Sequence, residues 1–127
     1  MIKLEYLLNK EKVFLHEFKN AKNVIEEFFY YSFQEEKEKI EKELNILFAS
    51  YNTGNYYVDA FVLFEKEGKL YEVNASHCSC YGLEEQWEPE EVLLEELEHR
   101  LINGTFGLNN WSDNNFREEL KEFLFKK

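Results

Sequence analysis

Apolar residues in the first third of the chain recur at spacings of three and four, which is the period of an amphipathic helix. The residues that follow this pattern are Phe14, Phe18, Ala21, Ile25 and Phe28. The spacing predicts a helix over roughly residues 12–30. Residues 34–44 then place Glu and Lys four positions apart, and such pairs stabilise a helix exposed to solvent.

The pattern then changes to short runs that are rich in aromatic and β-branched residues. Such runs over residues 46–51, 56–64 and 70–74 are typical of strands, and the segments between them carry turn residues, including Gly68. The short connections predict three antiparallel strands in a meander. The run over residues 56–64 is apolar at nearly every position, so we expect it to be a central strand covered on both faces.

Two further helices are predicted in the last third of the chain. Pro89 stands where the first turn of a helix favours it, an apolar stripe follows, and Gly104 ends the helix. A last helix is expected over residues 115–125, with Asn115 and Glu118 as a capping box. The sequence therefore predicts one α+β domain over residues 1–127, with about four helices packed on a three-stranded antiparallel meander in the order ααβββαα.

Composition and charge restrict the classes of partner. The chain has 127 residues, 12 Phe and 8 Tyr, and a formal net charge of −11, so we expect an aromatic core and an acidic surface. An acidic chain repels phosphate backbones, which disfavours direct binding of nucleic acid and favours a basic protein surface. There is no apolar run of about 18 residues to span a membrane. Glu5 interrupts the apolar N-terminal stretch, which is atypical of a signal peptide. Two cysteines without such a signal indicate the reducing cytosol.

Residues 76–91 hold both cysteines, one of the three histidines and the single proline. One interpretation is a metal site, in which His77, Cys78 and Cys80 bind zinc and His99 or an acidic residue completes the ligand set. The C-x-C spacing argues against it, because zinc sites usually separate paired cysteines by two to four residues. A nucleophilic cysteine with His77 or His99 as base, and a strained, easily reduced disulfide between the two thiols, are further alternatives.

A structural interpretation of the same segment is favoured over these reactive ones. In it Cys78 packs as a small hydrophobic residue, Gly82 permits a turn, Trp87 is buried, and Pro89 opens the following helix. On this interpretation the protein binds no cofactor.

Carboxylates are numerous within this segment and just after it. Glu84, Glu85, Glu90, Glu91 and Glu95 are candidates for binding a basic partner, although paired carboxylates are common in this chain and most are expected to form a solvated face.

The run from Ser76 to Glu84, followed by Gln86, Trp87 and Pro89–Glu91, resembles a family of small uncharacterised proteins that phages and bacterial mobile elements encode. The resemblance covers residues 61–101. It implies a genetic context, and by analogy a protein that acts on its host by binding and blocking.

These observations together predict a protein of the bacterial cytoplasm that binds and inhibits a host protein, such as a defence protein or one that handles nucleic acid, without catalysing a reaction. Two alternatives remain open. One is a zinc- or thiol-dependent enzyme, or a metal-binding module, built on His77, Cys78 and Cys80. The other is a structural protein that forms homo-oligomers. The sequence leaves the oligomeric state undetermined.

Overall fold

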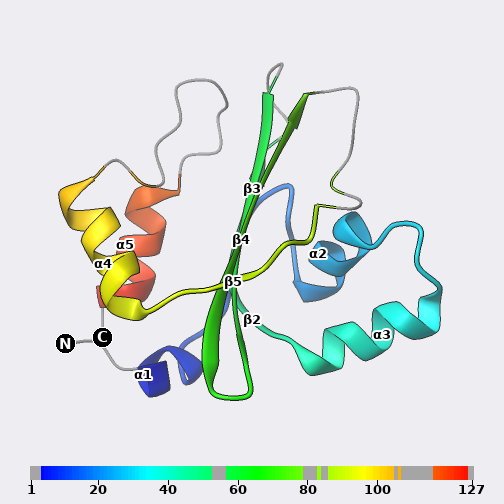
Figure 1. The fold of residues 1–127 in the computed structure, drawn as a ribbon, viewed down its shortest axis with the longest axis horizontal. Coiled ribbons are helices and arrows are strands. Elements are labelled where there is room, and N and C mark those ends of the chain that lie inside the picture. The colour runs from blue at the N-terminus through cyan, green and yellow to red at the C-terminus, as the bar shows by residue number, and fades with distance from the viewer. Residues whose placement is uncertain are drawn as a thin grey trace.

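The computed structural model describes residues 4–52, 57–78, 83, 86–104, 106 and 116–125, and of residues 52, 57–58 and 76–78 it describes the backbone. The described elements are α1 (Leu4–Leu8), β1 (Val13–His16), α2 (Ala21–Phe28), α3 (Gln34–Glu43), β2 (Asn45–Asn52), β3 (Tyr57–Lys66), β4 (Lys69–Cys78), β5 (Glu90–Glu91), α4 (Leu94–Asn103) and α5 (Arg117–Phe125). Figure 1 shows the sheet edge-on between two layers of helices. None of the described helices combines the length and the apolar character that crossing a membrane requires.

The five described strands form one mixed sheet in the order β1-β2-β3-β4-β5. The pairs β2–β3, β3–β4 and β4–β5 are antiparallel. Strand β1 pairs parallel with β2, and Val13 lies opposite Phe48. The predicted α+β class is confirmed, and β2, β3 and β4 form the predicted meander. The prediction of three strands and of the order ααβββαα is wrong, because β1 and β5 extend the sheet at its two edges and a fifth helix, α1, precedes β1.

The helix predicted over residues 12–30 is in fact a strand followed by a shorter helix. Val13–His16 is β1, which ends at His16 with a positive φ of 60°, and α2 starts only at Ala21. Asn20 caps α2, because its side chain accepts a hydrogen bond of 2.8 Å from the backbone N–H of Asn23. The helical spacing misled because Phe18, between the two elements, is buried in the same core as α2.

The central strand β3 separates two hydrophobic cores. Ala60, Val62 and Phe64 belong to one core, and Phe61 and Leu63 to the other, as the alternation of side chains along a strand requires. The prediction that this run is covered on both faces is confirmed for residues 60–64, all of which are buried. The first core lies under α2 and α3, and we call this side the α2–α3 face. The second core lies under α4 and α5 and defines the α4–α5 face (Figure 1).

An irregularity in β2 lets two consecutive residues face the same core. The register with β3 shifts between Ile46 and Phe48, and Leu47 and Phe48 are both buried on the α4–α5 face. A β-bulge has this effect, because the extra residue breaks the alternation. Phe48 then contacts Phe61, Phe116 and Phe123, with ring centroids 5.9–6.0 Å apart.

Several local predictions agree with the structure. The predicted turn at Gly68 joins β3 to β4 with positive φ values at Glu67 and Gly68 (52° and 82°), which match a two-residue hairpin turn. The predicted surface helix is α3, in which no side chain is fully buried. The last helix is α5, which begins at Arg117; Asn115 of the predicted capping box lies outside the described residues.

Candidate binding surfaces

The segment that carries Trp87 and Pro89 passes from one face of the sheet to the other. Trp87 packs on the α2–α3 face, where its ring lies edge-on to Phe28 (5.0 Å between centroids) and stacks on Phe64 (5.3 Å). A few residues later Val92 is buried in the core of the opposite face. In between, Glu90 and Glu91 form β5 and pair with β4 at the edge of the sheet (Figure 1, the yellow-green strand in front).

The prediction that Pro89 opens a helix is therefore wrong. Pro89 precedes β5, and α4 begins only at Leu94. Pairing with β4 keeps this part of the chain extended, and the Val92 N–H donates a hydrogen bond of 2.9 Å to the Leu70 carbonyl. Trp87 is half-buried in the described structure, and it anchors the segment before the segment crosses the sheet edge.

The candidate thiol and metal residues are only partly described. The backbone of His77 and Cys78 forms the last positions of β4, opposite Val58 and Tyr57 of β3, so this part of the expected loop is a strand. Cys80 and Gly82 lie outside the described residues, as do the candidate carboxylates Glu84 and Glu85.

His99 lies on α4, away from the end of the strand that carries the cysteine. Its Nδ1 is 3.0 Å from the side-chain amide of Asn103, one turn further along the helix. The neighbouring Arg100 binds Glu72 near the hairpin end of β4, whereas Cys78 is at the other end of that strand. Within the described part of the chain, no three side chains of His, Cys, Asp or Glu type converge as a metal site. The zinc site remains a prediction.

A buried carboxylate attaches α4 to the sheet. Glu72 is 6% exposed and accepts hydrogen bonds from both terminal nitrogens of Arg100, at 3.1 and 2.5 Å. The side-chain amide of Asn74 donates a third, at 2.6 Å, and the guanidinium lies 4.6 Å from the ring centroid of Phe106. These hydrogen bonds connect β4 to α4 and position the helix. The pair of Glu72 and Arg100 was not predicted from the sequence. The sequence feature that could have indicated it is a single Glu within an otherwise apolar strand pattern.

Exposed carboxylates gather where the crossing segment meets α4. We call this set the β5–α4 acidic surface; its members are Glu88, Glu90, Glu91, Glu95 and Glu96. Glu95 and Glu96 also border a shallow hollow, of about 410 Å³, together with His99 and Arg100.

The nearby cations do little to neutralise this surface. Arg100 is engaged by the buried Glu72, and Lys69 approaches Glu91 at 3.7 Å with both side chains well exposed. Exposed pairs of this kind interact weakly. The β5–α4 acidic surface therefore keeps a net negative charge, and it contains the candidate residues Glu90, Glu91 and Glu95.

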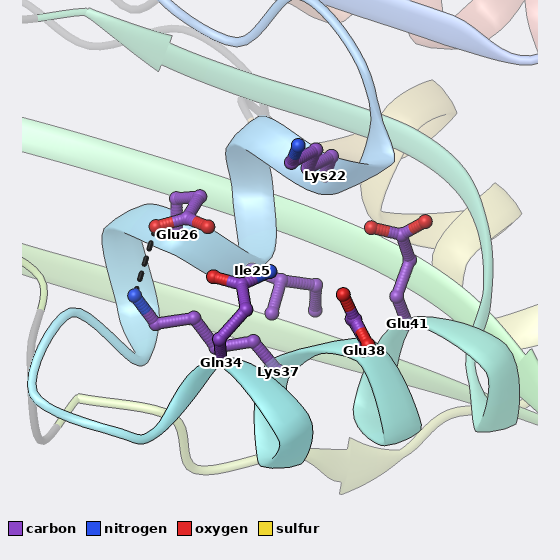
Figure 2. A pocket seen from close by; sticks show the side chains of 7 residues that line it. All are labelled: Lys22, Ile25, Glu26, Gln34, Lys37, Glu38 and Glu41. Atoms are coloured by element: carbon purple, nitrogen blue, oxygen red, sulfur yellow. Dashed lines mark hydrogen bonds and ion pairs between the residues drawn. The ribbon is translucent and has the colours of Figure 1, made fainter.

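On the other face of the sheet, a polar pocket of about 160 Å³ lies between α2 and α3. Figure 2 shows Lys37 of α3 paired with Glu26 of α2, whose charged atoms are 2.9 Å apart. Ile25 lines the pocket as well, and the remaining lining residues are Lys22, Gln34, Glu38 and Glu41. Because charges of both signs line it, the pocket favours no single charged ligand, and its ion pair joins the two helices.

Comparisons with protein-family models, with curated proteins and with solved structures found no match to this chain.

Proposed function

We propose that this protein acts by binding, and that the β5–α4 acidic surface occupies a basic surface of another protein and blocks it. The observation that carries the proposal is the exposed set of carboxylates on β5 and α4, beside which Arg100 is paired with the buried Glu72. In the phage-type setting that the sequence resemblance implies, the partner is a host protein that handles nucleic acid or defends the cell, and the site is the bacterial cytoplasm.

The physical basis of the proposal is electrostatic. A chain with a formal net charge of −11 is attracted to a positively charged groove over several ångströms before contact. Such steering raises the association rate and is screened as salt increases, because the Debye length falls to about 8 Å at physiological ionic strength. A groove that holds a nucleic-acid backbone has the complementary charge, so an acidic protein that fills it competes with the nucleic acid.

Two variants with equal net charge test the location of this surface. Glu90, Glu95 and Glu96 are replaced together by Gln in one, and Glu38, Glu41 and Glu43 of α3 in the other; all six side chains are exposed. Each protein is used to capture partners from a bacterial host lysate at low and moderate salt. We expect the wild type and the α3 variant to retain a basic protein at low salt, and the Glu90/Glu95/Glu96 variant to lose most of it.

The same experiment can overturn the proposal. If the two variants capture the partner equally well, its binding depends on net charge or on another surface. If the wild type retains no specific protein at either salt concentration, the blocking role is wrong.

A further inference from the structure

Three large aromatic side chains are exposed side by side in the connection between α2 and α3. Tyr30, Tyr31 and Phe33 are 64%, 77% and 80% exposed, and we call them the Tyr30–Phe33 aromatic surface. The rings of Tyr30 and Tyr31 meet edge-to-face with centroids 5.2 Å apart. Figure 1 places this connection on the outer side of the α2–α3 face, away from the sheet. Adjacent exposed aromatic rings are typical of binding surfaces, because they leave apolar area in water that a partner can cover.

The charges around these rings select the chemistry of the partner. Glu35 and Glu36, in the first turn of α3, follow Phe33 directly and are exposed. The nearest cation in the chain, Lys37, has a side chain only 12% exposed and is paired with Glu26. Two carboxylates therefore border the aromatic surface, and Lys37, the cation closest to it in the sequence, is already engaged.

A contact of the kind that such a partner would make is already present at one of these rings. The ammonium of Lys37 lies 6.0 Å from the centroid of the Tyr30 ring, within the range of a cation–π interaction. The more exposed rings of Tyr31 and Phe33 offer the same chemistry to a cation from outside. A guanidinium suits this better than an ammonium, because it is planar, stacks on aromatic rings and pairs with carboxylates through two hydrogen bonds.

We propose that the Tyr30–Phe33 aromatic surface binds an arginine-rich segment of another protein, whose guanidinium groups stack on Tyr31 and Phe33 and pair with Glu35 and Glu36. This site is additional to the β5–α4 acidic surface, since the two share no residue: the aromatic surface lies between α2 and α3, and the acidic surface runs from the sheet edge at β5 onto α4. Its partner is defined by arginine side chains and not by positive charge alone.

The test compares two labelled peptides of equal length and charge, one of alternating Arg and Gly and one of alternating Lys and Gly, by fluorescence anisotropy at physiological salt. We expect the wild-type protein to bind the arginine peptide more tightly, by about fivefold to tenfold. The double variant Tyr31→Ala/Phe33→Ala should bind both peptides equally. Both side chains are exposed, so the variant should fold, and a circular dichroism melt checks this.

Two control proteins test whether the preference for arginine belongs to these rings. Tyr6→Ala removes an aromatic ring of similar exposure (65%) from α1 and should keep the preference for arginine. The Glu90/Glu95/Glu96→Gln variant should also keep it, so that failure of the β5–α4 proposal and failure of this one give different results. Equal binding of the two peptides by the wild type, or an equal loss in Tyr6→Ala, would overturn the proposal. Light scattering that shows a dimer in the wild type and none in the double variant would also overturn the proposal, because a second copy of the chain would then cover the rings.

Discussion

At the scale of a single residue, Glu72 is a buried side chain whose role is structural. Its carboxylate holds Arg100 and Asn74 and so connects β4 to α4. We expect Glu72→Gln to lower the free energy of unfolding by about 1–3 kcal/mol, because the guanidinium loses its charged partner while remaining partly buried. Urea unfolding followed by circular dichroism measures the change.

The matched control for this prediction is Glu91→Gln, which breaks the exposed pair with Lys69. An exposed ion pair contributes about 0–1 kcal/mol, so this variant should unfold almost as the wild type does. If Glu72→Gln is equally harmless, the carboxylate is not what holds α4 in place.

At the scale of elements, the structure has the strand β1 where the sequence predicts the start of a helix over residues 12–30. A strand at the edge of a sheet is hydrogen-bonded on one side, so alternate amides should be protected from hydrogen exchange between Val13 and His16. A helix over residues 12–30 would leave the amides of its first turn unprotected and would protect consecutive amides from about residue 16 onward. In α2 the N–H of Val24 donates to the Asn20 carbonyl, so consecutive protection should begin near Val24. Amide exchange followed by NMR separates the two patterns, and continuous protection from His16 through Lys22 would contradict the strand.

The elements that could be predicted from the sequence are those stabilised by neighbours in the chain. The hairpin at Gly68 follows from its turn residues, and α3 from its Glu–Lys spacing. Strands β1 and β5 could not be predicted, because partners far along the chain keep them extended: Phe48 lies opposite Val13, and Tyr71 opposite Glu91. The same holds for Pro89, where pairing with β4 outweighed a local preference for the start of a helix.

The candidate sites divide in the same way, into those that the local sequence reveals and those that depend on packing. Exposed carboxylates such as Glu90 and Glu95 could be identified from composition and charge. The Tyr30–Phe33 aromatic surface could not, because Phe28 and Phe33 look alike in the sequence and only packing decides that one is buried and the other exposed. The engagement of Arg100 by Glu72 likewise depends on the way α4 docks on the sheet.

At the scale of the whole molecule, two cores share one sheet, so substitutions in different cores should act independently. Trp87→Phe on the α2–α3 face and Phe116→Leu on the α4–α5 face should each cost about 0.5–3 kcal/mol. Their costs should add to within about 0.5 kcal/mol in the double variant. Trp87→Phe combined with Phe28→Leu should deviate from the sum, since those two rings are in contact at 5.0 Å. Denaturant unfolding of the variants measures both sums, and coupling across the sheet as strong as coupling within one face would contradict this description.

The sheet between the two cores has a consequence for how this chain can work and change. Tyr31 follows α2, which packs on one core, whereas α4 packs on the other, so each outer side can vary under its own selection. The two proposed surfaces share no residue, so partners could occupy both at the same time. Such partners would be held apart by the sheet and the helices that cover it.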